Sequence, residues 1–187
     1  AVMGENLILN MESKGFTVAA HNRTTSKVDD FMAGRAAGKK IIGVHSLPDL
    51  VAALKKPRRI MLMVKAGVAV DAVIEQLVPL LDAGDIVIDG GNSFWKHDLE
   101  HAKYLGEKQL HFVDVGVSGG VWGLERGYCM MIGGPKEQVD LLDPIFATLA
   151  PGIGTVERTM RPQSAHQWKA EHGYVHCGPA GSGHFTK

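Results

Sequence analysis

The residues with the clearest potential for chemistry follow two predicted strands. One strand, Phe112–Val115, runs into Gly116-Val117-Ser118-Gly119-Gly120, and the other, Asp85–Asp89, runs into Gly90-Gly91-Asn92-Ser93. A strand that ends in glycines leaves backbone N–H groups open to a ligand, because no Cβ intervenes. The carboxyl ends of strands in an open α/β sheet are also where ligands bind. One such turn would more often be an ordinary tight turn, but the pair favours a shared pocket.

A third stretch, Asn22-Arg23-Thr24, follows a predicted strand over Phe16–His21. In a dinucleotide-binding domain, an acidic residue at the end of this strand would bind the ribose 2′-hydroxyl of NAD. Arginine beside hydroxyl groups suits a 2′-phosphate instead, because its guanidinium donates two parallel hydrogen bonds and no carboxylate repels the phosphate. The stretch therefore favours NADP. The alternative is that Thr25 or Ser26 only caps a helix over Lys27–Met32, with Arg23 solvated.

Helices and strands in alternation must position these turns. Ala1–Lys14 is predicted to be a loop entering a helix, with Gly15 just past its end, and the strand over Phe16–His21 follows. This order is the second part of a nucleotide-binding βαβ unit, so we expect its first strand before Ala1; Gly4 alone is a weak trace of the glycine-rich turn. The further elements expected are strands at Ile41–Val44, Arg59–Val64, Asp85–Asp89 and Leu110–Val115, and helices at Ser46–Lys56, Val68–Leu81 and Lys96–Lys108.

This alternation predicts an α/β fold: a Rossmann-like, doubly wound, mostly parallel sheet, truncated before its first strand. After the second glycine turn we expect a strand over Tyr128–Ile132 and a helix over Lys136–Leu149, whose apolar stripe faces the core. Pro151–Tyr174 is predicted to be loop with one short strand. Gly181–Lys187 is a glycine-rich entry to a new helix.

The expected loss of the first strand has consequences for folding. That strand is the central member from which a doubly wound sheet starts winding. Its neighbours, Thr17–Ala20 and Ile60–Val64, would be left with unpaired backbone groups and uncovered apolar faces. We therefore expect the chain alone to fold poorly and to be inactive.

The composition excludes several classes of protein. Lysine plus arginine (20) equal aspartate plus glutamate (20), so no net field selects nucleic acid or an acidic membrane. No window approaches the roughly 18 apolar residues of a membrane span. Cys129 and Cys177 have no metal-ligand spacing, and the nine histidines are scattered, so we expect free thiols and no metal. A cytoplasmic protein is the default.

These stretches together resemble the coenzyme domain of the 6-phosphogluconate dehydrogenase family. The resemblance covers nearly the whole chain and is specific because six motifs occur in the family's order: Ala1-Val2-Met3-Gly4-Glu5-Asn6-Leu7, Asn22-Arg23-Thr24, Val64-Lys65-Ala66-Gly67, Asp89-Gly90-Gly91-Asn92-Ser93, Gly116-Val117-Ser118-Gly119-Gly120 and Gly181-Ser182-Gly183-His184-Phe185-Thr186-Lys187. It implies an NADP-dependent enzyme that oxidises and decarboxylates 6-phosphogluconate to ribulose 5-phosphate. It also implies a coenzyme domain over 1–180, with 181–187 starting a helical domain that forms a homodimer in the full-length protein.

The resemblance assigns roles residue by residue. Lys187 is implied to be the catalytic base, with Asn92 contacting both substrate and coenzyme. The other implied contacts are Ser118, Gly119 and Gly120 with the sugar acid, Ala1, Val2, Met3 and Gly4 with the pyrophosphate, Asn22, Arg23 and Thr24 with the 2′-phosphate, and Val64, Lys65 and Ala66 with the nicotinamide half.

Two alternatives stay open beside this assignment. One is a β-hydroxyacid dehydrogenase of similar fold that acts on a smaller acid. The other is a truncated, inactive module that only binds NADP, in which Lys187 is an exposed lysine at the start of a helix. Residues beyond Lys187 would separate this module from the two enzymes.

Overall fold

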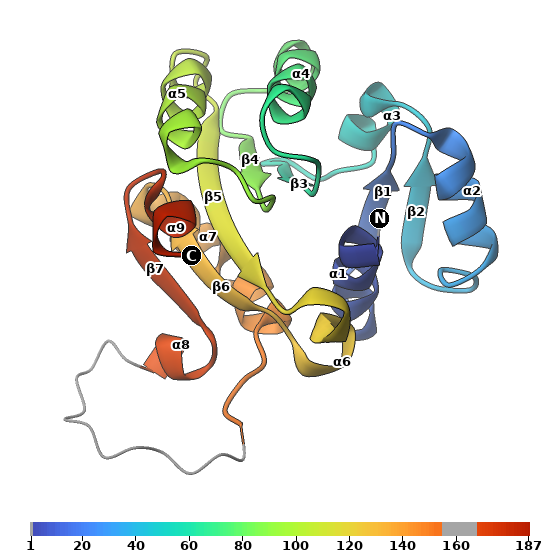
Figure 1. The fold of residues 1–187 in the computed structure, drawn as a ribbon. Helices are drawn as coiled ribbons and strands as arrows, with labels where there is room; N and C mark the ends of the chain where they lie inside the picture. Colours follow the sequence, from blue (N-terminus) through green and yellow to red (C-terminus); the bar gives the residue numbers. More distant parts are fainter. Residues whose placement is uncertain (1, 155–167) are drawn as a thin grey trace.

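The computed structural model describes residues 2–154 and 168–187, in which helices and strands alternate along the chain (Figure 1). The strands form two separate sheets, of two and of five strands. The smaller sheet pairs β1 (Val18–His21) with β2 (Ile41–Val44) in parallel. The larger sheet has the order β3-β4-β5-β6-β7, formed by Arg59–Leu62, Ile86–Asp89, His111–Ser118, Cys129–Gly133 and Tyr174–Gly178.

Most neighbouring strands are parallel, which confirms the predicted α/β fold with a mostly parallel sheet. The β3, β4 and β5 strands run in one direction, and their register places Asp89 beside Asp114 at the carboxyl ends. The β6 strand is antiparallel to β5 and parallel to β7. The ends of β4 and β5, where the glycine turns were predicted to meet, are therefore neighbours.

The larger sheet is buried on both faces, as its continuous apolar runs predict. Side chains alternate between the faces, so Ile88 and Val113 pack with α1 (Val2–Ser13) and α7 (Lys136–Leu149). Val87 and Phe112 point the other way and pack with α4 (Val68–Leu77) and α5 (Trp95–Gly106). Figure 1 shows α4 and α5 together on one side of these strands. The result is three layers with β4 and β5 at the centre.

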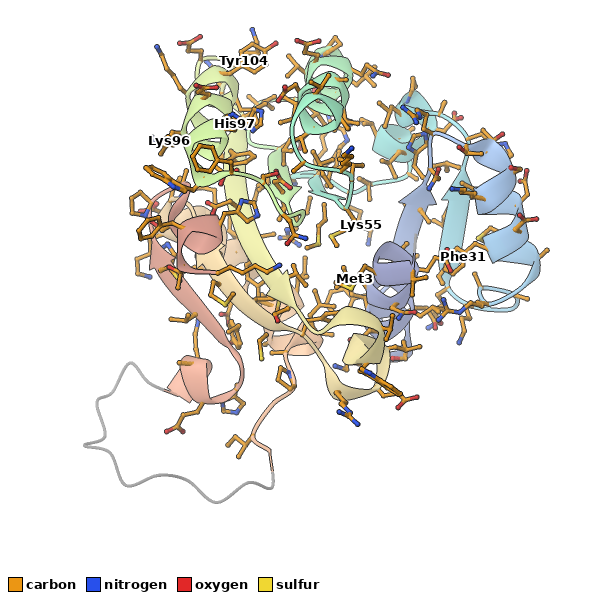
Figure 2. All side chains as sticks on the ribbon, in the orientation of Figure 1. Met3, Phe31, Lys55, Lys96, His97 and Tyr104 are labelled. Atoms are coloured by element: carbon orange, nitrogen blue, oxygen red, sulfur yellow. The ribbon has the colours of Figure 1, made fainter. Side chains whose placement is uncertain are left out.

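The α1 helix joins the two sheets. Its Leu7 belongs to the core of the larger sheet, while Leu9 belongs to the core of the smaller one. Asn6 donates a hydrogen bond of 3.1 Å to the Val121 carbonyl and accepts one of 2.6 Å from Arg35. Met3 extends from the first turn of α1 and packs against the core of the larger sheet (Figure 2).

The two strands expected beside the first strand of the fold are edge strands. Within the described residues, β1 pairs only with β2, and β3 pairs only with β4. Their outer edges therefore present backbone N–H and C=O groups to which a further strand could pair. The smaller and larger sheets are held together by helix packing rather than by a strand ladder between β1 and β3.

The remaining helices and turns connect these layers. Ser46 caps α3 as predicted, since its Oγ accepts a 3.2 Å hydrogen bond from the Asp49 N–H. No helix in the described part of the chain is both long and apolar enough to cross a membrane. The other elements are α2 (Thr25–Ala33), α3 (Leu47–Ala52), η1 (Val78–Leu80), η2 (Gly120–Trp122), α6 (Gly123–Arg126), α8 (Trp168–Glu171) and α9 (Ser182–Thr186).

Two expectations from the sequence need correction. Gly116 and Val117 lie inside β5 rather than in a turn, because they pair with β6, which the sequence did not predict as a partner. The loop predicted over 151–174 falls largely on 155–167, outside the described residues, but its described part contains the short helix α8. A strand, β7, then follows. Residues 181–187 contain α9, which packs on β5, β6 and β7, and the start of a second domain there stays a prediction.

Candidate active site

The turn after β4 is folded back onto the last residue of that strand. Asp89 is fully buried, and its two carboxylate oxygens accept hydrogen bonds from the Gly91 N–H (2.9 Å) and the Ser93 hydroxyl (2.6 Å). These bonds satisfy a carboxylate that would be costly to bury unpaired. They also hold the turn so that Asn92, between the two donors, is exposed at the carboxyl end of β4.

The α9 helix is fastened to β5 by a second buried carboxylate. Asp114 accepts hydrogen bonds from the Gly181 N–H (2.6 Å) and the His184 N–H (2.8 Å). These are backbone groups at the helix start that have no partner within a helix. The contact is close, because a Cβ on Gly183 would lie 2.5 Å from the Met131 carbonyl oxygen. The α9 backbone therefore lies directly against β5 and β6.

Lys187 follows α9 and reaches back across the end of the sheet. Its Nζ donates hydrogen bonds to Asn92 Oδ1 (2.5 Å) and to the Val117 carbonyl (2.7 Å). Burial lowers the pKa of this lysine, because removing water disfavours the ammonium form. Three segments far apart in the chain thus meet at one amine, and the structure brings Lys187 and Asn92 together.

Gly116 explains how the lysine stem fits against β5. A Cβ at this position would lie 2.7 Å from Lys187 Cβ and 3.1 Å from the Gly183 carbonyl oxygen. Glycine is therefore used here for close approach rather than for a turn. Ser118 ends β5, and Gly119 and Gly120 follow it; all three are exposed beside the Val117 carbonyl that Lys187 contacts.

A second site lies at the carboxyl ends of β1 and β3. Asn22 Oδ1 accepts a 2.9 Å hydrogen bond from the Thr24 N–H, which shapes the turn and leaves Arg23 exposed. Arg23 and Lys65 line one cavity of about 430 Å³, with Ala66 and the first turns of α4. A cavity with two cations and no carboxylate among these lining residues suits an anion.

Thr24, Thr25 and Ser26 do not cap α2 in the way the alternative interpretation requires. The N-cap is Thr24, its side chain makes no capping hydrogen bond, and Thr25 and Ser26 lie within the helix. The hydroxyl groups beside Arg23 are therefore not explained by capping, and they remain available to a ligand.

The other predicted coenzyme contacts lie around the same end of the sheets. Val2, Met3 and Gly4 form the first turn of α1, while Ala1 lies outside the described residues. A Cβ on Gly4 would lie 3.7 Å from Met63 Cβ, so this turn adjoins the segment after β3. That segment contains Val64, Lys65 and Ala66 and leads into α4.

Sequence reasoning missed the buried polar residues beneath the lysine. His184 Nδ1 and Asp98 Oδ2 share a hydrogen bond of 2.7 Å, and both side chains are almost completely buried. Asp114 could have been suspected, since it is a carboxylate inside an apolar strand run. Asp98 carried no such signal, because an acidic residue in the first turn of a helix is common.

Asp89, Asp98 and His184 also bring potential ligand atoms within 4.8 Å of one another, a spacing that a metal ion could use. Hydrogen bonds engage part of this group: both oxygens of Asp89 accept from the turn, and Asp98 Oδ2 pairs with His184 Nδ1. Asp98 Oδ1 and His184 Nε2 are buried without a partner among the described residues. The expectation of no metal stays a prediction.

Comparison with known proteins agrees with this geometry. A family model described as the NAD binding domain of 6-phosphogluconate dehydrogenase matches residues 1–159. Over its whole length the chain is 48% identical to the decarboxylating 6-phosphogluconate dehydrogenase of Treponema pallidum and 50% identical to that of Ovis aries. The chain spans 36% of the length of each of these relatives.

Solved structures give the same result. The 6-phosphogluconate dehydrogenase of Plasmodium falciparum, studied in its apo form and in complexes with NADP⁺ and with 6-phosphogluconate, matches with a TM-score of 0.84 and 32% identity, over 99% of this chain and 37% of that one. A 3-hydroxyisobutyrate dehydrogenase of Mycobacterium tuberculosis matches with a TM-score of 0.77 at 18% identity, over 100% of this chain and 54% of that one, which shows a likeness of fold alone.

The fold and these comparisons define the class: this is a Rossmann-like NAD(P)-binding domain. The matching family model and the relatives are more specific. The chain belongs to the 6-phosphogluconate dehydrogenase family, in which it corresponds to the N-terminal NAD-binding domain.

Proposed function

We propose that this chain is the coenzyme-binding part of an NADP-dependent enzyme that oxidises and decarboxylates 6-phosphogluconate to ribulose 5-phosphate. The observation that carries the proposal is the placement of Lys187. Its amine lies between Asn92 and the Val117 carbonyl, at the carboxyl ends of β4 and β5, where ligands bind in this class of fold.

Lys187 is suited to act first as a base and then as an acid. Its pKa is lowered by burial, so a larger fraction is neutral near pH 7 than for an ordinary lysine. The neutral amine takes the proton of the C3 hydroxyl while hydride leaves C3, which gives a 3-keto acid. The resulting ammonium group then polarises the ketone, and the bond to the carboxylate breaks with release of CO₂. The electron pair of that bond forms a C2–C3 enediol, in which the C3 oxygen takes the lysine's proton, and a further proton at C2 gives ribulose 5-phosphate.

The neighbouring polar groups orient the substrate. Asn92 accepts from the lysine through Oδ1, which directs its Nδ2 donor group to the substrate. The Ser118 hydroxyl and the Gly119 and Gly120 amides are exposed beside the lysine's second partner, and backbone amides suit a carboxylate. Contacts with several substrate groups at once increase the fraction of bound substrate that is oriented for reaction.

NADP, when bound, accepts the hydride. The residues present fit this coenzyme, because Arg23 and Lys65 line one cavity and the hydroxyls of Thr24 to Ser26 are not used in capping. We assign the adenosine 2′-phosphate to Arg23, Thr24 and Asn22. The cavity also favours Lys65 as a second cation for this phosphate, rather than as a group that flanks the nicotinamide. Val2 to Gly4, in the first turn of α1, would face the pyrophosphate.

The proposal extends to the assembly. A homodimer of the full-length protein is what the resemblance implies, with residues after 180 leading into the helical domain. The cytoplasm is the location that the composition favours. Light scattering of the full-length protein would show twice the mass of one chain if the dimer forms.

The test is turnover by the full-length protein. We expect NADPH and CO₂ in equal amounts from 6-phosphogluconate, and no comparable turnover of 3-hydroxyisobutyrate. NADPH formed from the smaller acid without CO₂ would instead identify a β-hydroxyacid dehydrogenase. Tight NADP⁺ binding without turnover of either acid would identify a module that only binds the coenzyme.

A further inference from the structure

Beneath the lysine lies a buried cluster that the proposed mechanism does not use. Asp89, Asp98 and Asp114 are all fully buried, and the His184 side chain is only 1% exposed. Each comes from a different element: the end of β4, the first turns of α5, the middle of β5, and α9. Three carboxylates and one imidazole so close together need close mutual compensation, because burying an unpaired charge costs several kcal/mol.

Each carboxylate has at least one hydrogen-bond partner, although Asp98 Oδ1 and His184 Nε2 are buried without one among the described residues. Asp89 is satisfied by the turn that carries Asn92, and Asp114 by two N–H groups at the start of α9. Asp98 depends on His184, whose Nδ1 lies 2.7 Å from Asp98 Oδ2 and 4.0 Å from Asp114 Oδ2. Burial alone would lower the pKa of His184, but the hydrogen bond and charge of Asp98 raise it overall. The pKa of His184 thus lies above the ordinary value of histidine because of its contact with Asp98.

The geometry links this cluster to both partners of the reactive amine. Asp98 belongs to the helix that begins directly after the Asn92 turn, so its bond to His184 ties that segment to α9. Lys187 continues the same short helix, since its N–H donates a 3.1 Å hydrogen bond to the Gly183 carbonyl. Any movement of α9 on β5 therefore moves the lysine relative to Asn92.

We propose that Asp98, Asp114 and His184 are positioning residues for Lys187. The position of α9 on β5 and α5 is set by the Asp98–His184 hydrogen bond and by the two hydrogen bonds that Asp114 accepts from the start of α9. That position of α9 holds the Lys187 amine between Asn92 and the Val117 carbonyl. The chemical role of the lysine rests on the function proposed above, whereas its placement is a separate property that can be measured without turnover.

A directional polar cluster serves this purpose better than apolar packing would. Apolar contacts lose little when a short helix slides or rotates by a fraction of an ångström, whereas hydrogen bonds weaken steeply with distance and angle. A displacement of about 1 Å at a reacting group can cost on the order of 10²-fold in rate. The cluster thus restricts α9 to one placement.

The test compares isosteric variants in the full-length protein. In Asp114→Asn one carboxylate oxygen becomes an amide NH₂, which cannot accept the hydrogen bond from the start of α9. Asp98→Asn removes the charge that faces His184. Asp98→Asn is the milder change, since an amide oxygen still accepts from neutral imidazole, and it serves if Asp114→Asn does not fold. The matched control is Asp85→Asn. Asp85 is also a buried aspartate, 1% exposed, but it directly precedes the first residue of β4, at the end of the strand opposite to Asp89, and accepts a hydrogen bond from Arg58.

The first measurement is the pH dependence of hydride transfer. We expect both test variants to slow transfer by about ten- to a hundredfold, with NADP⁺ affinity unchanged within about twofold. Because a loosened α9 would return Lys187 to water, its lowered pKa should rise, and the acidic limb of the profile should move to higher pH. The Asp85→Asn control should keep the wild-type profile even if it unfolds more easily. A wild-type profile in both test variants would overturn the proposal.

The second measurement does not need turnover. Competitive labelling with acetic anhydride across a pH series, read by mass spectrometry, gives the pH at which Lys187 becomes reactive. In the wild type this pH should lie below the ordinary range of a lysine, and Asp114→Asn should raise it toward that range. If wild-type protein fails to oxidise 6-phosphogluconate, the proposed function fails, yet this labelling still decides the positioning role. Identical labelling of Lys187 in wild type and both variants would exclude that role.

Discussion

The coenzyme side and the lysine side of this domain hold their functional groups in different ways. On the coenzyme side, Arg23 is an exposed cation on a short turn shaped by one side-chain bond from Asn22. On the lysine side, Lys187 is placed by a network whose members are almost completely buried and come from four separate elements. An exposed cation can adapt to a phosphate, which accepts bonds from many directions. A base that must take one proton needs one fixed position.

The largest effect should come from removing the amine on the lysine side. Lys187→Ala in the full-length protein should lower the rate of hydride transfer by on the order of 10²–10⁴, the usual contribution of a general base. NADP⁺ affinity should hardly change, because the cavity proposed for the coenzyme lies at the ends of β1 and β3. Stopped-flow measurement of NADPH formation gives the rate, and calorimetry gives the affinity.

Lys108→Ala is the control for that variant, since Lys108 stacks on Tyr104 away from both sites, with Nζ 4.8 Å from the ring centre. If Lys187→Ala keeps the rate of the control, the lysine is not the base, and the two sides no longer differ in the way described.

A smaller loss should follow from crowding the lysine without removing it. Gly116→Ala places a methyl group 2.7 Å from Lys187 Cβ, close to the α9 backbone, so α9 must shift. We expect hydride transfer to slow by about ten- to a hundredfold, with NADP⁺ affinity unchanged. In Gly106→Ala the new methyl group meets nothing within 4 Å, so this control should behave as wild type. Equal rates in the two alanine variants would show that the placement of Lys187 tolerates movement.

On the coenzyme side the expected effect is on selectivity rather than on rate. Arg23→Asp removes a charged contact to the 2′-phosphate and adds a repulsion, so NADP⁺ binding should weaken relative to NAD⁺ by about 2 kcal/mol, or roughly 30-fold. Lys65→Ala should act in the same direction but more weakly, because lysine offers a point charge instead of a planar fork.

Calorimetric titration with both coenzymes checks this, with Arg126→Asp as the control; Arg126 stacks on Trp122 at 5.3 Å and lies outside the cavity. Equal losses of affinity for NADP⁺ and NAD⁺ would show that Arg23 does not contact the 2′-phosphate. If Arg23→Asp changes the selectivity for NADP⁺ over NAD⁺ but Lys65→Ala does not, Lys65 contacts the nicotinamide half of the coenzyme instead.

The smallest expected effect is a difference in the pH dependence of local stability. The folded pKa of His184 is raised overall by Asp98 despite burial, and burial raises that of Asp98. A raised folded pKa stabilises at low pH, and the contribution is lost as pH rises through it. His184 therefore predicts that α9 loses stability as the pH rises above about 6.5, the ordinary pKa of histidine. The loss from Asp98 begins lower, above about pH 3.9, the ordinary pKa of aspartate.

The coenzyme side should respond with the opposite sign. Burial lowers the pKa of His21 at the end of β1, so its contribution is present above about pH 6.5 and is lost as pH falls through the lowered value. Amide exchange, corrected for its intrinsic pH dependence, can compare α9 with β1. His184→Gln should flatten the dependence at α9 only. If the local stability of α9 and of β1 changes with pH in the same direction, the opposite pKa shifts of His184 and His21 do not control it.

The local features of the domain could be predicted from the sequence. The α7 helix has the predicted bounds, Lys136–Leu149, and β2 has the predicted bounds, Ile41–Val44, because apolar periodicity and Gly or Pro at element ends are local signals. The sequence also singled out Arg23 and Lys65, which line one cavity, because an exposed charge after a strand needs no partner elsewhere in the chain to be recognised. Their contact with the coenzyme stays a prediction.

The tertiary structure decided the rest, because it depends on which distant segments share a surface. Gly116 was predicted in a turn, but pairing with β6 keeps it in β5, where the absence of a side chain admits the stem of Lys187. The pairing of Asp98 with His184 spans 86 residues of sequence and leaves no periodic signal. The residue types at the site were thus visible in the sequence, whereas the position of the amine depends on contacts that exist only after the sheet and α9 have packed together.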